Sequence, residues 1–224
     1  MRRGGLLIIA ALLGACAAAP GPPGVQRDAL GEPRNGFPSW DERVIHLWVN
    51  RARSDPQTEL ASCAGCTERA CYQPVPPVRW SYDLNRAARF HSANLTVAGC
   101  GIQHDSPCVL VADISAQYRP GPCDGAVACA CQGGQVNCGG GTVWSTRIGM
   151  FGSGTSGENI ASGGPGDPLG AFYMWLYEGY NKITCGFDFD PPTNGHRYNI
   201  LNGQHGALGV GCAGSYCTQD FGGG

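Results

Sequence analysis

The sequence predicts a mixed α+β domain whose helices and strands do not alternate regularly. The residues after Ser39 and after Ser81 carry apolar side chains at helical spacing, and a third such segment follows Asp167. Two short apolar runs, 207–212 and 216–221, flank a turn near the C-terminus and indicate an antiparallel strand pair. Because the predicted strands gather near the end, this order excludes a doubly wound parallel sheet.

The first helix is predicted from its ends as well as from its periodicity. Ser39 and Glu42 have capping-box spacing, so that each side chain would satisfy a backbone N–H of the first turn. Val44, Ile45, Trp48 and Ala52 then share one face, and Pro56 ends the helix.

The second helix begins near Ser81 or Tyr82, and Gly99 suits its C-terminal cap. His91 lies on its apolar face, where we expect a buried, hydrogen-bonded residue rather than a metal ligand.

The third helix has Asp167 as N-cap and Pro168 at its first position. The spacing predicts that Leu169, Phe172 and Leu176 face the core.

The stretch 108–141 interrupts this pattern. It contains five Cys among many Gly and Ala and shows little periodicity. Its apolar residues are too sparse for a core of its own, so we interpret it as a disulfide-stapled insertion.

Composition bounds the class of protein. The 224 residues suit one domain plus a tether, and 42% of them are apolar, which is enough for a packed core. Only 14% are charged, while Gly and Pro number 36 and 16, so a coiled coil or a helical repeat is excluded. The net charge of -2 argues against a nucleic-acid partner.

The N-terminus predicts export. Arg2 and Arg3 precede the eight-residue apolar run 6–13, which is too short to span a bilayer and suits a signal peptide over residues 1–15. Leu13-Gly14-Ala15-Cys16 resembles a lipoprotein cleavage box, so we expect lipidation of Cys16, a Pro/Gly-rich tether over 16–38, and the domain over 39–224. Ala17 after the lipidated Cys resembles outer-membrane lipoproteins. The alternative is an ordinary signal peptide and a secreted protein.

Thirteen Cys indicate an oxidising compartment, and removing Cys16 leaves an even number. Cys63 and Cys66 have the spacing of half a zinc ribbon, but no matching second pair exists, so disulfides are favoured. Cys212 and Cys217 flank the turn of the predicted strand pair, and we expect them to form a disulfide.

Four residues have the chemistry of a metal site: His104, Glu158, Glu178 and His196. Neutral imidazoles with carboxylates suit a divalent ion, zinc before others. No two of them share one turn of a helix, so spacing alone leaves a structural role open for each. Glu178 adds a clue, because a carboxylate in the last turn of a helix costs roughly 0.3–1 kcal/mol that a nearby cation would offset.

Seven segments of the chain resemble, in order, motifs of the SCP/CAP superfamily of cysteine-rich secretory proteins, venom allergens and plant pathogenesis-related proteins, with the bacterial branch most similar. They are Pro77–Leu84, Ala87–Ser92, Gln103–Pro107, Gly157–Ala161, Met174–Glu178, Gly195–Leu201 and Thr218–Gly222.

The resemblance covers about residues 40–222 and implies a three-layer α-β-α sandwich. It also implies that His104, Glu158, Glu178 and His196 meet in one cleft, with the two His as direct metal ligands and the Glu residues acting through water. Two insertions, at 108–141 and 181–192, depart from the family pattern and bear on access to that cleft.

Three functions follow from the resemblance. The favoured one is a lipid-anchored binding module of the cell envelope, not an enzyme, that recognises a protein, glycan or lipid partner as a monomer. The second is a metal-dependent hydrolase of peptides or cell-wall material, in which Glu158 or Glu178 accepts a proton from metal-bound water. The third is a lipid or sterol carrier.

Overall fold

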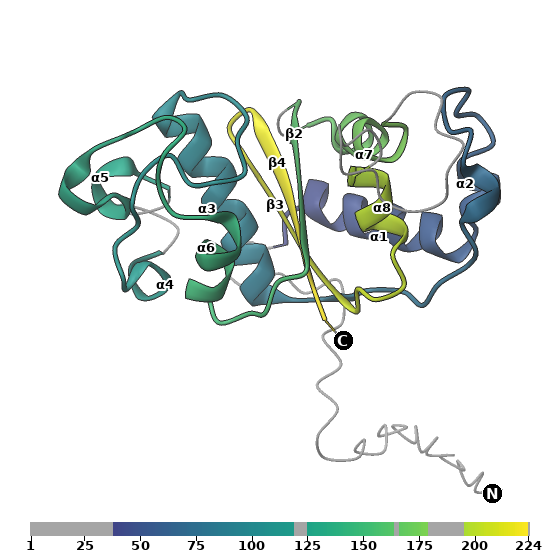
Figure 1. Ribbon diagram of the computed structural model, residues 1–224, viewed down its shortest axis with the longest axis horizontal. Coiled ribbons are helices and arrows are strands. Elements are labelled where there is room, and N and C mark those ends of the chain that lie inside the picture. The colour runs from purple at the N-terminus through teal and green to yellow at the C-terminus, as the bar shows by residue number, and fades with distance from the viewer. Residues whose placement is uncertain (1–37, 119–124, 164–165, 179–194, 224) are drawn as a thin grey trace, which may run out of the picture.

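The computed structural model describes residues 38–118, 125–163, 166–178 and 195–223 (Figure 1). A four-stranded sheet stands between two groups of helices, seen almost edge-on in Figure 1. One group contains α3 (Tyr82–Ala98) and α6 (Trp144–Met150), and the other contains α1 (Trp40–Ser54), α7 (Pro168–Leu176) and α8 (Gly195–Leu201). The α+β prediction and the three α-β-α layers are therefore confirmed.

The strands follow the order β1-β3-β4-β2 across the sheet. The predicted pair is present as the antiparallel hairpin of β3 (Ala207–Ala213) and β4 (Tyr216–Gly222). Two further strands had no clear signal in the sequence: β1 (Arg79–Trp80), which runs parallel to β3, and β2 (Gly157–Ser162), which runs antiparallel to β4. Because β2 has only one neighbour, it forms an edge of the sheet.

The ends of the first two predicted helices are confirmed. Ser39 and Glu42 form both hydrogen bonds of the capping box, and α1 ends at Ser54, after which Pro56 begins the short helix α2 (Pro56–Glu59). The Ser81 side chain caps α3, and Gly99 ends it in the left-handed conformation at φ 68°.

The third helix differs from its prediction in one side chain. Asp167 caps α7 and Pro168 occupies its first turn, while Phe172 and Leu176 are fully buried. Leu169, however, is 38% exposed, so its predicted core position is wrong. Pro168 is buried in the same turn, because the helix turns that side chain toward the core and Leu169 away from it.

Helix α3 lies directly on the sheet because β3 presents glycines to it. A Cβ on Gly209 would stand 2.1 Å from the backbone N of Asn85, and a Cβ on Gly211 would stand 2.0 Å from the backbone N of Arg89. These two glycines are two residues apart and therefore face the same side of the strand. Their missing side chains fix how closely the helix approaches.

Each face of the sheet has its own buried cluster. On the α1 side the cluster includes Ile45, Phe172, Trp175, Leu208 and Val210. On the α3 side it includes Leu84, Phe90, Leu110, Ile148 and Phe151. The sheet thus divides the core into two, as expected for three layers.

The insertion contributes to the α3-side cluster. Its apolar residues Leu110 and Ile114 are buried, and Tyr118, which follows α4 (Ile114–Gln117), contacts the rings of Phe90 and Phe151 edge-on. Two further short helices follow, α5 (Val127–Ala130) and the 3₁₀ helix η2 (Gln132–Gly134). The described part of the insertion therefore packs into the α3-side cluster and does not form a separate core.

Four disulfides join described residues: Cys63–Cys66, Cys100–Cys138, Cys108–Cys131 and Cys212–Cys217. Cys71, at the end of the 3₁₀ helix η1 (Arg69–Cys71), and Cys129 are also disulfide-bonded. The pair Cys212–Cys217 lies in direct register across the hairpin, with the Cα atoms 4.1 Å apart. These bonds agree with folding in an oxidising compartment.

Within the described part of the chain, no helix combines the length and the apolar character needed to cross a membrane. The predicted signal peptide, Cys16, nearly all of the predicted tether and the predicted insertion at 181–192 lie outside the described residues.

Candidate functional site

The first half of the site pairs His104 with Glu158. Glu158 lies on the edge strand β2, and His104 lies in the loop that follows α3. The imidazole Nδ1 stands 2.8 Å from the Glu158 Oε1. The His104 side chain is 50% exposed, whereas the Glu158 side chain is 1% exposed, so the carboxylate supports the imidazole from beneath.

A buried arginine holds Glu158 in its charged form. The guanidinium of Arg147, from α6, forms an ion pair with the Glu158 Oε2. Burial raises the pKa of Glu158, but the charge of Arg147 and further partners outweigh burial and lower the pKa to about 2. Asp220, opposite Glu158 on β4, is fully buried, and burial raises its pKa well above the usual value. Glu158 is therefore the ionised member of this neighbouring pair of carboxyl groups.

The second half of the site pairs His196 with Glu178. His196 lies in the first turn of α8, and its Nδ1 stands 3.0 Å from the Glu178 Oε1. The backbone N–H of His196 donates to the Glu178 Oε2 at 2.7 Å. Both side chains are about a quarter exposed, at 28% for His196 and 25% for Glu178.

Glu178 stands just beyond α7 rather than in its last turn, because that helix ends at Leu176. The predicted cost of a carboxylate in the last turn of a helix therefore does not apply to Glu178. The buried guanidinium of Arg197 donates to the backbone carbonyl oxygens of Leu176, at 2.9 Å, and of Glu178, and forms an ion pair with Glu68. Arg197 thus satisfies one carbonyl at the end of α7 and one just beyond it, where the helix dipole favours a cation.

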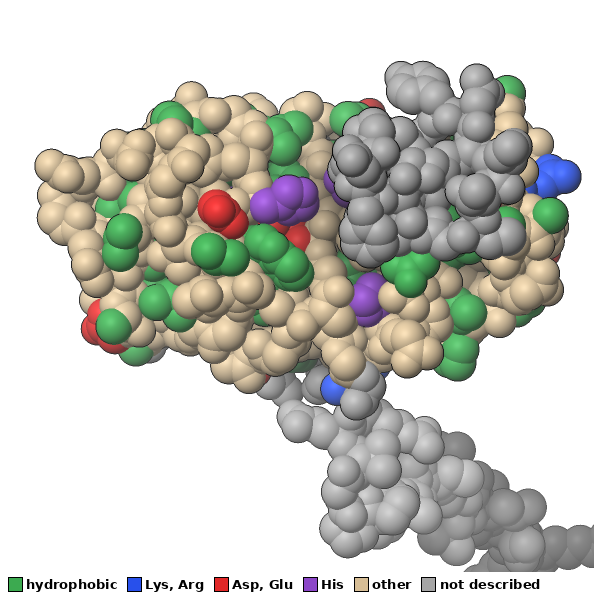
Figure 2. All heavy atoms as spheres, in the orientation of Figure 1, with side chains coloured by type: hydrophobic (Ala, Val, Ile, Leu, Met, Phe, Trp, Pro, Cys, Tyr) green, Lys and Arg blue, Asp and Glu red, His purple; other side chains and the backbone are tan. Residues whose placement is uncertain are grey.

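The structure brings all four predicted residues to one cavity of about 480 Å³. Ile102, Ile160, Met174 and Asn199 also line it. Figure 2 shows histidine, acidic and hydrophobic side chains close together near the middle of one face of the molecule. Since the four residues come from β2, α8 and two loops, only the fold assembles them.

A second cavity, of about 390 Å³, continues the first. Both are lined by His104, Glu158 and Asn199, and the second adds Trp144 and Tyr198. We call the two together the cleft. None of the described residues of the stretch 108–141 lines either cavity, so this part of the insertion lies aside from the cleft.

The carboxylate partners favour one tautomer of each imidazole. Each Nδ1 faces a carboxylate, which favours the tautomer with the proton on Nδ1 and leaves the lone pair of Nε2 for an ion. The donor chemistry of His104 and His196 therefore fits a divalent metal. No group of three or more His, Cys, Asp or Glu side chains among the described residues is placed to hold an ion directly.

The other three histidines have structural positions. The Nε2 atoms of His91 and His46 lie 2.9 Å and 3.0 Å from the carbonyl oxygens of Gln103 and Val78, and both side chains are buried. Burial lowers the pKa of His91 to about 3 and that of His46 to about 4. His205 is also buried, stacks on Phe221, and has a pKa lowered by burial to about 4. The interpretation of His91 as a core residue is confirmed.

Sequence reasoning missed the two buried arginines and the aromatic wall of the cleft. Arg197 directly follows His196, a position that offered a signal. Arg147 and Trp144 offered none, because nothing in the sequence shows that α6 lies against His104 and Glu158.

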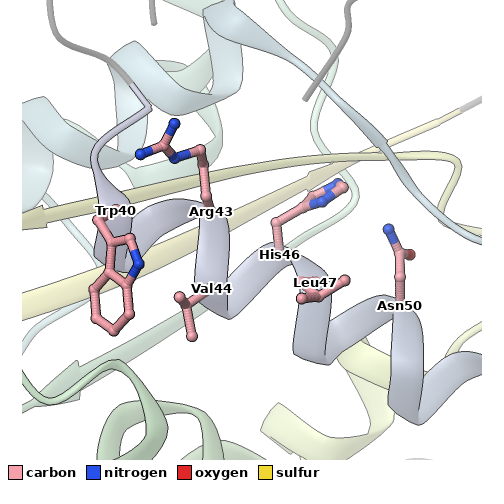
Figure 3. A pocket seen from close by; sticks show the side chains of 6 residues that line it. All are labelled: Trp40, Arg43, Val44, His46, Leu47 and Asn50. Atoms are coloured by element: carbon pink, nitrogen blue, oxygen red, sulfur yellow. The ribbon is translucent and has the colours of Figure 1, made fainter. Parts of the chain in front are cut away.

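A separate hollow runs along α1 and contains none of the four predicted residues (Figure 3). It measures about 410 Å³ and is lined mainly by apolar surface from Trp40, Val44 and Leu47, with Arg43, His46 and Asn50 beside them. Trp40 and Leu47 are 64% and 62% exposed.

Comparison with known proteins gives the family. A solved structure of an extracellular protein containing a SCP domain, from Bacillus anthracis str. Ames, is similar with a TM-score of 0.45 and 19% identity. The match covers 80% of this chain but 40% of that one, so this chain spans less than half of that protein's length. No curated protein matches. The model of the CAP family, described as the cysteine-rich secretory protein family, matches residues 49–222, and the chain therefore belongs to this family.

Proposed function

We propose that the protein is an exported, lipid-anchored CAP domain that acts as a binding module, with a cleft that takes a divalent metal ion. The ion would be held by the Nε2 atoms of His104 and His196, and zinc suits this donor set best. The carrying observation is that both imidazoles line one cavity, each with its Nδ1 against a carboxylate.

The carboxylates orient the imidazoles in this proposal. Glu158 and Glu178 fix the tautomer and the ring plane and make Nε2 a better donor, as the partners of metal-bound histidines usually do. When bound, the ion would supply a positive centre for an anionic or carbonyl oxygen of a partner. Trp144 and Tyr198 would add apolar surface beside it.

The membrane assignment rests on the N-terminal segment. A lipidated Cys16 and a tether of about 22 residues would hold the domain at the cell envelope, and the disulfides of the folded part agree with export. We assign the anchor to the outer membrane from Ala17. Without lipidation the same domain would be secreted.

Metal-dependent hydrolysis of peptides or cell-wall material is the second candidate, and one observation favours it. Glu178 is partly exposed in the cleft, and among the described residues its carboxylate faces His196 rather than a buried arginine side chain, so it is the carboxylate better placed to contact a bound water. Glu158 is unsuitable, because it is buried and its pKa of about 2 makes it a weak base.

Zinc titration of the mature full-length protein tests the metal site. We expect the double variant His104→Ala/His196→Ala to lose zinc binding, while His46→Gln, which changes a buried imidazole outside the cavity, keeps it. Affinity should be lower in acid, because a metal-binding imidazole must be neutral. Unchanged affinity in the double variant would overturn the site.

Two assays separate the functional classes. Hydrolysis of peptides or cell-wall fragments that disappears in Glu178→Gln would establish the enzyme, whereas the absence of turnover by the zinc-loaded protein favours the binding module. Mass spectrometry of the purified protein tests the carrier function, since a bound lipid or sterol would favour the apolar hollow along α1 as its site.

A further inference from the structure

Behind each histidine–glutamate pair stands one fully buried arginine. Arg147 and Arg197 are both 0% exposed, and neither belongs to the residues expected to bind the metal. Burying a guanidinium costs folding free energy unless its N–H donors are hydrogen-bonded. The acceptors of those hydrogen bonds therefore indicate which groups the arginine positions.

Arg147 holds both members of the first pair. Its Nη1 donates to the backbone carbonyl oxygen of His104 at 2.7 Å and lies 3.4 Å from the Ser106 hydroxyl, while its Nη2 pairs with the Glu158 Oε2. The other oxygen of Glu158 faces the His104 ring. One planar group therefore fixes the backbone of His104 and the carboxylate that orients the His104 ring.

Arg197 holds the second pair from the opposite layer. Its Nη1 donates to the carbonyl oxygens of Leu176 and Glu178, and its Nε donates to the Glu68 Oε1 at 2.6 Å. Because Arg197 follows His196 in α8, these bonds connect the helix that carries the imidazole to the segment that carries Glu178. The distance between the two partners is thereby set by one side chain.

Arg53 shows what a purely structural arginine looks like in the same fold. It is also 0% exposed, and its hydrogen bonds go to backbone carbonyl oxygens of Pro76, Ile200, Asn202 and His205. None of these groups belongs to the four residues of the metal proposal. Arg53 therefore joins backbone segments away from the four residues, whereas Arg147 and Arg197 each contact a histidine–glutamate pair.

We propose that Arg147 and Arg197 are the positioning residues of the cleft, each setting the orientation of one imidazole. The inference rests on the proposed metal function and adds the residues that orient its two imidazoles. Lysine cannot replace either one, because a single ammonium lacks the planar fork that reaches two acceptors at once. Each arginine serves only its own pair, so the two effects should be separable.

Three matched variants of the mature full-length protein test this: Arg147→Lys, Arg197→Lys and the control Arg53→Lys. The readout is the ¹⁵N chemical shifts of the imidazoles without metal, which report the tautomer of each ring. We expect Arg147→Lys to reduce the Nδ1–H tautomer of His104 and leave His196 unchanged, and Arg197→Lys to do the reverse. Arg53→Lys should lower the unfolding midpoint in urea and change neither imidazole.

Zinc titration of the same proteins gives the second readout. We expect each of the first two variants to lose about 10–100-fold in affinity, as loss of a partner behind a metal-bound histidine usually does. Should Arg147→Lys fail to fold, the double variant Arg147→Gln/Glu158→Gln removes both buried charges together, and it is compared with Glu158→Gln alone. A further change in the His104 shifts then belongs to Arg147, and identical shifts would count against its positioning role.

The outcomes are distinguishable. Unchanged imidazole shifts in Arg147→Lys and Arg197→Lys, or equal changes in both rings in every variant, would overturn the positioning role. A wild-type protein that binds no zinc would overturn the metal function, while the imidazole shifts would still decide the role of the arginines.

Discussion

Glu178 contacts His196 at two points, with Oε1 3.0 Å from the ring Nδ1 and Oε2 2.7 Å from the donating backbone N–H. Glu158 divides its two oxygens differently, between the ring of His104 and the guanidinium of Arg147. The two pairs therefore use the same chemistry in different surroundings. One carboxylate is partly exposed, and the other is buried against a charge.

This difference predicts contrasting effects of the same substitution. Glu158→Gln leaves the charge of Arg147 buried without its counter-ion and should cost about 3–5 kcal/mol of folding free energy. Glu178→Gln should cost no more than about 1 kcal/mol, because its charge is partly solvated. Urea unfolding measures both, and equal losses would contradict the burial argument.

Acid should destabilise the protein through His46. Its pKa is about 4 in the folded chain and about 6.5 when unfolded, so the unfolded chain binds the extra proton between these values. Stability from the neutral imidazole is present above pH 6.5 and is lost as the pH falls through this window, by up to about 1.4 kcal/mol per pH unit.

The test compares wild type with His46→Gln by urea unfolding at about pH 7 and about pH 5. The raised pKa of Asp220 acts with the opposite sign but is common to both proteins, so it cancels in the difference. We expect wild type to lose more stability than His46→Gln. A parallel decline would refute the assignment.

The two disulfides should contribute different amounts to the free energy of unfolding, because they close loops of different length. Cys212–Cys217 spans 5 residues and Cys108–Cys131 spans 23. Loop entropy predicts a loss of about 2 kcal/mol for replacing the first pair by Ala and about 3.4 kcal/mol for the second. Urea unfolding of the two double variants gives the comparison, and the reverse order would show that strain or packing dominates.

The insertion should open before the rest of the domain under reducing conditions. Cys100–Cys138 ties it to the loop after α3, and Cys108–Cys131 closes a loop within it, so reductant removes both of these covalent constraints. Hydrogen exchange with reductant should therefore show early exchange around α4 and α5 and continued protection of β3 and β4. Simultaneous exchange of all four elements would contradict this order.

Gly211 should be intolerant of any side chain. A Cβ there would stand 2.0 Å from the backbone of α3, which cannot move aside as a flexible side chain does. We expect Gly211→Ala to cost at least about 1–3 kcal/mol. Gly149→Ala is the matched control, because nothing lies within 4 Å of its Cβ and alanine favours its helix. Equal stability of the two variants would contradict the close approach.

Local signals predicted much of this fold. The capping residues Ser39 and Ser81, the stop at Gly99 and the turn between β3 and β4 act within a few residues, so the sequence records them directly. Strand β1 was not predicted, because two residues are too few to show a periodic pattern. Strand β2 was not predicted, because its buried residues include Glu158 and Asn159, so its sequence shows neither an apolar run nor a regular alternation. Leu169 was misplaced because the rotation of α7 depends on its neighbours.

By itself, the sequence determined the layered α+β class, the helix ends, the hairpin with its cystine, and the four residues of the cleft through their family motifs. The tertiary structure alone decided that Arg147 and Arg197 stand behind those residues, that Glu158 is the buried carboxylate and Glu178 the partly exposed one, and that the described part of the insertion does not line the cleft. The physical reason is the separation along the chain over which each kind of interaction acts. Caps and turns depend on neighbours along the chain, whereas burial and charge pairing depend on segments that meet only when the sheet closes.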